Sequence, residues 1–561
     1  MSDLPKNQAL RTTAIGIDLG TTRSVVAEID RLGLPRTLVN AEGDPTTPSA
    51  VYLDGDNILV GKEAVKALAI DSSRGATCVK REIGNEHFKL TVDDTDYPAE
   101  LVQSFVLAKL RIDAERTRGE TIEKAVISVP AFFDEPKRRA TIDAGRLAGL
   151  DVIAVVNEPT AAALAFCSHG QHANPQATLA TSETVVVYDL GGGTFDVSLL
   201  NVEGDRINVI GIDGNARLGG LDWDNCLSDW LAEQLTSTFA ISQELLNSVR
   251  FTLQREAEEV KHTLSARPST KVHLQILGHE LRTEIGRDQF DRMTEHLLDR
   301  TRFTVRKLLR ECGYQWNQID RVLLVGGSTR MPQVHAMLQR ESNTTIDCSV
   351  SPDQAVAHGA AIFASLLENE ASEPNRVRDV NAHHLGVLGR EVASGQPRGH
   401  VMIPRNTPLP SQKISRFETI EDNQRSVVIR VFEGGDVRGT QSTRIGTFTV
   451  HDLPPGLPAG TPVDVALKYD RDGIIDAEAT VADTGRKACI RIERAAGMTT
   501  PQRERWRDQT RQIHRKLSES ASAVAAEART VAAEISDRPG SPLIHQCWRQ
   551  IKRKIWPTHK R

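Results

Sequence analysis

The fold is decided by two similar stretches of sequence, IGIDLGTT at residues 15–22 and VYDLGGGT at residues 187–194. Each stretch begins as an apolar strand, passes through an aspartate (Asp18 or Asp189) and enters a turn of glycine and threonine. Further β-like sequence follows each turn. The pattern therefore predicts that a strand–turn–strand hairpin occurs twice in the chain.

Turns of this composition are suited to binding phosphate. Glycine lets backbone N–H groups come close to an anion, and threonine hydroxyls add further donors. Asp18 and Asp189 lie where a carboxylate could hold the water shell of Mg²⁺. A third glycine turn, GGSTR at residues 326–330, follows a strand and leaves room for a nucleoside. A single turn of this kind is usually only a turn, but two matched copies and a third glycine pair predict a nucleotide clamp.

Other nucleotide and hydrolase motifs are missing from the sequence. The string nearest to a P-loop, GDNILVGKE at residues 55–63, has one residue too many and ends in glutamate. No GxGxxG motif follows a predicted strand, and neither HExxH nor GxSxG occurs. By its motifs the chain is therefore neither a P-loop enzyme nor a serine hydrolase.

The composition indicates an ordinary soluble protein of several domains. The chain has 561 residues, with 69 basic and 74 acidic side chains and a net charge of −5, which argues against a dedicated nucleic-acid binder. The last 63 residues are the exception, with 14 basic and 6 acidic side chains. The seven scattered cysteines indicate free thiols, and the sequence shows neither a secretory signal nor a long apolar run. We therefore expect a cytoplasmic protein.

The sequence divides into four regions. Residues 12–370 alternate β-branched strands with helical stretches, which predicts an α/β module. A polar linker follows at residues 371–379. Short alternating strands separated by turn clusters predict an all-β domain over residues 380–498. Residues 499–561 return to a helical composition, and we expect a short helical extension with a basic tail there.

The motifs resemble those of the heat shock protein 70 (DnaK-like) chaperones, within the actin-like ATPase superfamily. The resemblance covers roughly residues 12–498. It implies an actin-like ATPase domain with a duplicated, ribonuclease H-like α/β fold, followed by a β-sandwich that binds peptides and a short helical lid. The strings that carry it are GIDLGTT (16–22), VKREIG (79–84), SVPAFFDEPKRRAT (128–141), NEPTAAALA (157–165), YDLGGGTFD (188–196), LGGLDWD (218–224), VGGSTRMP (325–332) and SPDQAVAHGAA (351–361).

The resemblance also implies a role for individual residues. Asp18 and Asp189 would order Mg²⁺ through water, Lys80 would reach the terminal phosphate, and Glu158 and Asp196 would arrange the attacking water. The implied catalytic residues are Lys80, Glu158, Asp189, Thr194 and Asp196. The implied nucleotide-binding residues are Gly20, Thr21, Thr22, Gly191, Gly192, Gly193, Glu258, Lys261, Ser265, Gly326, Gly327, Ser328, Arg330 and Asp353. Glu258, Lys261 and Ser265 are spaced so that they share one helix face, as an adenosine clamp requires.

In the β domain, the resemblance implies a groove that holds an extended apolar peptide by main-chain hydrogen bonds and one side-chain pocket. Our candidates for that pocket are Phe417, Ile420, Val427 and Ile429; the alternative for each is ordinary sandwich core. A J-domain co-chaperone and a nucleotide exchange factor are the further partners implied, and no specific nucleic acid is expected.

Several features depart from the family pattern. The linker lacks the leucine-rich run of the family, so less apolar surface is available for docking on the ATPase domain. Ile142 and the apolar run at residues 153–156 replace basic residues on the surface that receives J-domain partners in the family. Arg23 replaces the expected asparagine and places a cation beside the first phosphate turn.

The C-terminal region is also unusual. The helical extension is shorter than the family's lid, which predicts weaker trapping of peptide and faster exchange. Residues 542–561 have the spacing of a basic amphipathic helix. Such a helix would touch a membrane surface or an acidic partner, or else pack its tryptophans back on the protein.

The sequence is therefore compatible with three functions. The first is an ATP-driven chaperone that binds apolar segments and releases them on nucleotide exchange. The second is an actin-like small-molecule kinase, against which the all-β domain speaks. The third is a nucleotide-regulated binding protein for one dedicated client. The altered linker and the short lid are the features that support this third function.

Overall fold

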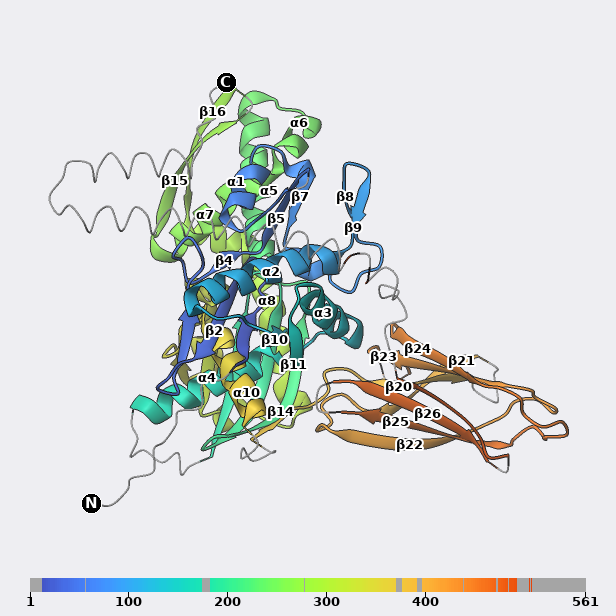
Figure 1. The fold of residues 1–561 in the computed structure, drawn as a ribbon. Coiled ribbons are helices and arrows are strands. Elements are labelled where there is room, and N and C mark those ends of the chain that lie inside the picture. The colour runs from blue at the N-terminus through green and yellow to red at the C-terminus, as the bar shows by residue number, and fades with distance from the viewer. Residues whose placement is uncertain are drawn as a thin grey trace, which may run out of the picture.

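The structure is a computed structural model. It describes residues 13–491 except 56, 174–181, 277, 370–375, 391–395, 437, 471–472 and 483, together with residues 504 and 506. Figure 1 shows a tall N-terminal module of sheets and helices with a β-sandwich on one side.

The first central sheet contains the first predicted hairpin. Its β1 pairs antiparallel with β2 across the turn and parallel with the later strand β10. The strands in order are β11 (Asp151–Asn157), β10 (Lys124–Val129), β1 (Ile15–Asp18), β2 (Arg23–Ile29) and β3 (Pro35–Leu38), with β4 (Thr47–Pro48) paired to β2.

The second central sheet repeats this design. Its β12 carries the second aspartate, pairs antiparallel with β13 and pairs parallel with the later strand β17. The order is β18 (Thr345–Asp347), β17 (Arg321–Val325), β12 (Glu183–Leu190), β13 (Phe195–Glu203), β14 (Arg206–Asn215) and β19 (Val377–Arg378). The repeat predicted from two turns is therefore a repeat of most of a sheet, and the duplicated α/β fold is confirmed.

Two helices, α4 (Glu158–Ala173) and α10 (Ala355–Glu368), join the two sheets. Their buried residues share one core with residues of both sheets. Small residues allow this packing, because a Cβ atom on Gly359 of α10 would lie 1.7 Å from the carbonyl oxygen of Ala161 in α4. The same helix crosses β1 so closely that Gly16 could not carry a side chain there.

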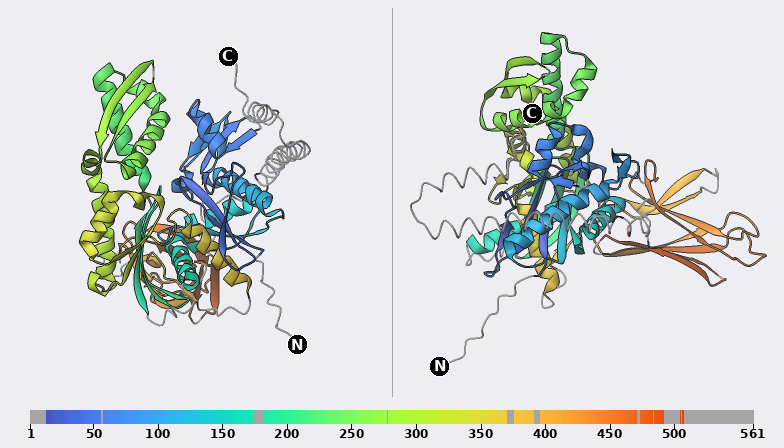
Figure 2. Two further views of the ribbon diagram at one scale, coloured as in Figure 1. Left: turned by 90° about the vertical axis from the view of Figure 1, so that its left-hand side faces the viewer. Right: turned by 45° about the horizontal axis from the view of Figure 1, so that its top comes forward.

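The remaining helices pack on the two sheets or lie beyond the second sheet, at the upper end of the module (Figures 1 and 2). Those packed on the first sheet are α2 (Ala99–Arg118) and α3 (Glu135–Leu147). Those associated with the second sheet are α5 (Gly220–Phe239), α6 (Gln243–Ser248), α7 (Arg250–Ala266), α8 (Arg287–Glu311) and α9 (Pro332–Ser342).

Small sheets and short helices complete the N-terminal module. A three-stranded sheet has the order β6 (Asn57–Val60), β5 (Ala50–Asp54) and β7 (Gly75–Thr77), and α1 (Lys62–Leu68) packs on it. Two hairpins are formed by β8 (Leu90–Val92) with β9 (Thr95–Tyr97), and by β15 (Ser269–Ile276) with β16 (His279–Gly286). Short 3₁₀ helices are η1 (Ser72–Arg74), η2 (Val79–Glu82), η3 (Trp316–Gln318) and η4 (Gly327–Arg330).

The C-terminal domain is a sandwich of two four-stranded sheets. Alternate residues of one strand, such as Val463, Val465 and Leu467, are buried in its core, which confirms the predicted all-β domain. One sheet has the order β21 (Pro397–Ile403), β20 (Leu385–Arg390), β23 (Val427–Glu433) and β24 (Thr443–Val450). The other has the order β22 (Ser411–Glu418), β25 (Pro462–Tyr469), β26 (Ile475–Val481) and β27 (Arg486–Arg491).

The linker reaches the N-terminal module as a strand. Val377 in β19 pairs with Ile207 in β14, and the Ile207 amide donates to the carbonyl oxygen of Arg376 at 2.8 Å. Docking therefore uses main-chain hydrogen bonds in addition to the small apolar surface of Val377.

Most of the predicted helical extension lies outside the described residues, as does the whole basic segment at 542–561. Trp506 is described; its ring lies 6.0 Å from that of Tyr97 in β9. None of the described helices is both long and apolar enough to cross a membrane.

Candidate functional site

The two phosphate turns meet in the folded chain. A Cβ atom on Gly193 would lie 2.3 Å from the Oγ1 atom of Thr21, and one on Gly192 would lie 2.5 Å from that of Thr22. Only glycine fits at these two positions, because any side chain would collide with the opposite turn. Arg81, next to Lys80, ties the two halves together, since its Nε donates to the Gly193 carbonyl oxygen at 2.9 Å.

The turns line a cavity of about 440 Å³. Most of the nucleotide-site residues predicted from the sequence contribute to its wall. The predicted residues that line it are Asp18, Gly20, Thr21, Thr22, Lys80, Glu158, Asp189, Gly191, Gly192, Thr194, Glu258, Lys261, Ser265, Gly326, Gly327, Ser328, Arg330 and Asp353.

Four carboxyl groups crowd the inner end of the site. Burial raises the pKa of Asp18 to about 7, and Glu158 adds to this rise. Burial, with Glu158 again second, also raises the pKa of Asp196 to about 7. For Asp189 the same two causes raise the pKa well above its ordinary value. The cluster therefore favours any ligand that brings positive charge.

Two of these carboxylates have an oxygen free to receive such a ligand. The Oδ2 atoms of Asp189 and Asp196 are buried without a hydrogen-bond partner, whereas Asp18 accepts from the Ser128 hydroxyl at 2.9 Å. No group of three or more His, Cys, Asp and Glu side chains within the described ranges is arranged to hold a metal directly. This donor set fits Mg²⁺, which usually keeps several of its waters and needs only one or two protein carboxylates.

Lys80 is the cation of this inner region. It is buried, and its Nζ lies 2.5 Å from the Oε1 atom of Glu158 at the start of α4. Burial works to lower the pKa of Lys80, but the carboxylates of Glu158 and Asp18 outweigh it and raise that pKa. Lys80 therefore stays charged in this inner part of the cavity.

The outer end of the cavity is formed by α7 and the third glycine turn. Lys261 Nζ pairs with Asp224 of α5 at 2.7 Å, and Arg330 pairs with Asp353 at 2.7 Å. Ser328 Oγ donates to the carbonyl oxygen of Gly191 at 2.9 Å, which joins the third turn to the second phosphate turn. The wall is therefore held by contacts between segments far apart in sequence.

Two predicted residues do not line the cavity. Gly193 lies behind the second turn against Thr21, and Asp196 accepts from the Phe132 amide at 2.8 Å. Sequence reasoning also missed lining residues. Asp224 belongs to the quoted string LGGLDWD, so the family motif could have found it, whereas no sequence signal marks His262 or Thr46. The missed lining residues also include Val25, Met331, Pro352 and Val356, whereas Arg23, which the sequence places beside the first phosphate turn, lines the cavity too.

The four peptide-pocket candidates lie in one region of the sandwich but differ in exposure. Ile429 is buried in the core, while Phe417 and Val427 are half-buried at its edge. Ile420 lies in the loop after β22 and is 58% exposed. Their role in peptide binding stays a prediction, and Ile429 offers the least surface for it.

The junction between the module and the sandwich is polar and specific. Asp379 at the end of the linker accepts from Asn157 Nδ2 at 2.8 Å and from Thr160 Oγ1 at 3.1 Å. Arg138 donates to Asn157 Oδ1 at 2.6 Å. Since Glu158 follows Asn157 directly, the linker contacts the element that begins at the candidate catalytic site.

The fold and the cavity together define the class of protein: an actin-like ATPase module joined by a linker to a β-sandwich. The family model described as "Hsp70 protein" matches residues 14–540. The chain belongs to the Hsp70 family, and it is an ATPase and a chaperone of that type.

Among its relatives are proteins named "Chaperone protein DnaK". That of Halobacterium salinarum is 38% identical over 498 residues, which cover 87% of this chain and 76% of the relative. That of Mycoplasma mobile is 37% identical over 497 residues, covering 86% and 79%. That of Thermotoga maritima is 38% identical over 490 residues, covering 84% and 79%.

Proposed function

We propose that the protein binds extended apolar segments of client proteins in its β-sandwich and releases them under the control of ATP binding and slow hydrolysis. The observation that carries the proposal is the position of Asn157 and Glu158. One contacts the linker through Asp379 and the other contacts Lys80 in the nucleotide cavity. A change at the terminal phosphate thus has a short path to the linker. We propose the same boundaries as the sequence predicts, with the ATPase domain at residues 12–370 and the peptide-binding domain at 380–498.

In this proposal the chain positions the nucleotide rather than reacting with it. The two facing turns bind the polyphosphate, and Glu258, Lys261 and Ser265 bind the adenosine. Asp18 and Asp189, with Asp196 nearby, would hold Mg²⁺ through water, and the ion would neutralise phosphate charge. Lys80 stabilises the charge on the terminal phosphate, while Glu158 and Thr194 orient the attacking water.

The partners follow from the same proposal. Client segments bind near Phe417, Ile420, Val427 and Ile429, and a J-domain protein and an exchange factor act on the ATPase domain. We infer that J-domain binding differs from the family pattern, because Val155 and Val156 line a second cavity of about 340 Å³ at the domain junction. Location in the cytoplasm and contact of the basic tail with a membrane or an acidic partner remain our predictions.

The deciding experiment measures how fast a labelled apolar peptide leaves the full-length protein, by fluorescence anisotropy, with ATP and with ADP. We expect faster release with ATP. In Thr194→Ala the hydrolysis rate should fall, while ATP should still speed up release. An off-rate in the wild type that is the same with both nucleotides would overturn the proposed coupling.

A second candidate is a binding protein for one dedicated client. The linker supports this second candidate, because Val377 is the only apolar side chain of the described linker residues 376–379. A peptide array separates the two, since a general chaperone binds many apolar peptides and a dedicated protein binds one or none. Phosphate release without an added acceptor separates both from a small-molecule kinase.

A further inference from the structure

The nucleotide cavity has an imbalance of charge. Six carboxyl groups line it among the described residues: Asp18, Glu158, Asp189, Asp224, Glu258 and Asp353. Four lysine and arginine side chains line it as well, and three of them are already paired with one of those carboxylates. These pairs are Lys80–Glu158, Lys261–Asp224 and Arg330–Asp353.

Arg23 is the fourth cation. It lines the cavity and is exposed, and within the described part of the chain its guanidinium makes no ion pair or hydrogen bond like those of the other three. It follows Thr22 directly, so its side chain starts beside the first phosphate turn. His262 lies on the opposite wall. Burial is the largest cause that lowers its pKa, the charge of Lys261 is the next, and the charge of Arg23 also lowers it. The charge of Arg23 is therefore felt across the cavity.

The backbone that carries Arg23 is firmly held. The Thr22 carbonyl oxygen accepts from the Ser49 amide at 2.8 Å, and Ser49 Oγ donates to the Gly20 carbonyl oxygen at 2.8 Å. Arg23 itself pairs with Pro48 in β4.

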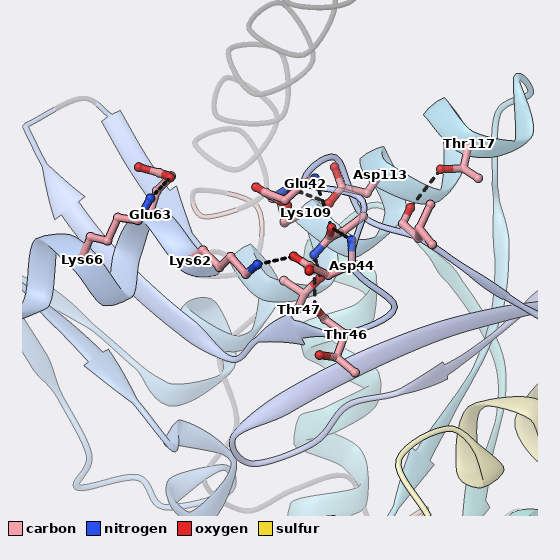
Figure 3. A network of polar contacts seen from close by, with 12 residues as sticks. Glu42, Asp44, Thr46, Thr47, Lys62, Glu63, Lys66, Lys109, Asp113 and Thr117 are labelled. Atoms are coloured by element: carbon pink, nitrogen blue, oxygen red, sulfur yellow. Dashed lines mark hydrogen bonds and ion pairs between the residues drawn. The ribbon is translucent and has the colours of Figure 1, made fainter. Parts of the chain in front are cut away.

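The loop before β4 is braced in turn by polar contacts (Figure 3). Lys62 Nζ lies 2.5 Å from Asp44 Oδ2, and Lys109 Nζ lies 3.4 Å from Glu42 Oε2. Asn40 Nδ2 donates to the Thr46 carbonyl oxygen at 3.1 Å. A residue mounted on such a turn loses little main-chain freedom when its side chain engages a ligand.

We propose that Arg23 is a phosphate-binding residue of this chain, whose guanidinium contacts the polyphosphate of the bound nucleotide from the side of the first turn. Guanidinium binds phosphate through two parallel N–H donors, so an unpaired arginine beside a phosphate turn is well suited to this contact. The other three cations of the cavity are already paired with carboxylates. Arg23 therefore supplies positive charge that is still available to a phosphate group. The inference rests on the proposed nucleotide-binding function and deepens it.

The test is calorimetric binding of ADP and of adenosine, with Mg²⁺, to the full-length wild type, Arg23→Gln and Arg23→Lys. We expect Arg23→Gln to weaken ADP binding by roughly tenfold, the lower range for a charged hydrogen bond because the site is partly solvated. Adenosine binding should not change. Arg23→Lys should recover part of the lost affinity, since lysine keeps the positive charge but lacks the two parallel N–H donors of the guanidinium.

The matched control is Arg31→Gln, an exposed arginine just beyond the far end of the same strand. It should bind ADP as the wild type does. A salt series gives a second readout: ADP affinity should fall less steeply with KCl in Arg23→Gln than in the wild type.

Unchanged ADP affinity in Arg23→Gln, an equal loss for adenosine, or parallel salt dependences would each overturn the role of Arg23. Failure of the wild type to bind ADP at all would instead overturn the nucleotide-binding function, so the two failures are distinguishable.

Discussion

At the scale of single residues, the cavity depends on buried charges that compensate one another. Lys80 and Glu158 are both buried and in contact, with further carboxylates nearby. Removing one partner of a buried pair leaves the other uncompensated, which typically costs roughly 3–5 kcal/mol. A variant of Lys80 therefore tests catalysis only if stability is followed as well.

We predict that Lys80→Met abolishes most ATP hydrolysis and retains ATP binding, because it removes the charge facing the terminal phosphate. Single-turnover hydrolysis should slow by at least roughly a hundredfold, as for loss of an electrostatic group in other sites. Lys80→Met should also lower the free energy of unfolding. The double variant with Glu158→Gln should regain stability but not hydrolysis. Normal hydrolysis in either would remove Lys80 from the mechanism.

The close approach of the two turns gives a second prediction at this scale. Gly193→Ala should weaken binding of ATP and ADP by tenfold or more, because the new methyl group would push Thr21 and its turn away. Gly286→Ala is the control, since its Cβ would lie an ordinary 3.8 Å from the Pro268 carbonyl oxygen. Calorimetry on both variants measures the effect, and equal affinities would contradict the facing of the turns.

At the scale of elements, the linker strand β19 connects the sandwich to the second central sheet. It is two residues long, and a strand of that length adds little stability by itself. Asp379, directly after it, accepts two side-chain hydrogen bonds from the ATPase domain and one from the Val380 amide. Docking of this linker therefore depends on one carboxylate more than on apolar burial.

We predict that Asp379→Ala releases the linker. Asn157 and Thr160 would lose their acceptor, and trypsin would cut after Arg376 or Arg378 faster than in the wild type. The comparison is made in the nucleotide condition that best protects the wild-type linker. Glu421→Gln, an exposed acid of the sandwich, serves as control and should be cut at the wild-type rate. Equal rates for Asp379→Ala and the wild type would contradict this account.

At the scale of the whole molecule, the sandwich meets the ATPase domain through Glu433 at the end of β23. Its Oε2 accepts from the Glu135 amide at the start of α3 at 2.8 Å. The charged and titratable groups around it are Asp134, Glu135, Arg138 and Tyr469. Burial raises the pKa of Glu433 to about 8, followed by the charge of Asp134, and burial raises that of Glu135 to about 7.

We predict that docking of the two domains weakens as the pH rises. In the undocked state Glu433 should have its ordinary pKa of 4.5, so a raised pKa in the docked state means that docking favours the protonated form. The contribution is fully present below pH 4.5 and is lost as the pH rises through about 8. Energy transfer between dyes on the two domains measures docking between these limits. Glu433→Gln keeps the acceptor and should flatten the profile; an unchanged profile would exclude Glu433 as the cause.

Much of the nucleotide site could be predicted from the sequence because its chemistry is local. A glycine turn after an aspartate keeps its character wherever the strand is placed, and residues of both turns, Lys80 and the face of α7 do line one cavity. Asp196 was placed less well. One of its carboxylate oxygens accepts from the Phe132 amide, a contact between segments 64 residues apart, and Asp196 is not among the residues that line the cavity.

The sequence alone determined the duplicated strand–turn–strand pattern, the α/β and all-β division and the residue types of the phosphate turns. All of these follow from spacing and side-chain chemistry within short windows. Only the tertiary structure decided that Arg23 faces α7 across one cavity, that Asp379 reaches Asn157, and that Glu433 meets the start of α3. These contacts join segments that are distant in sequence, so they exist only once packing has brought the segments together.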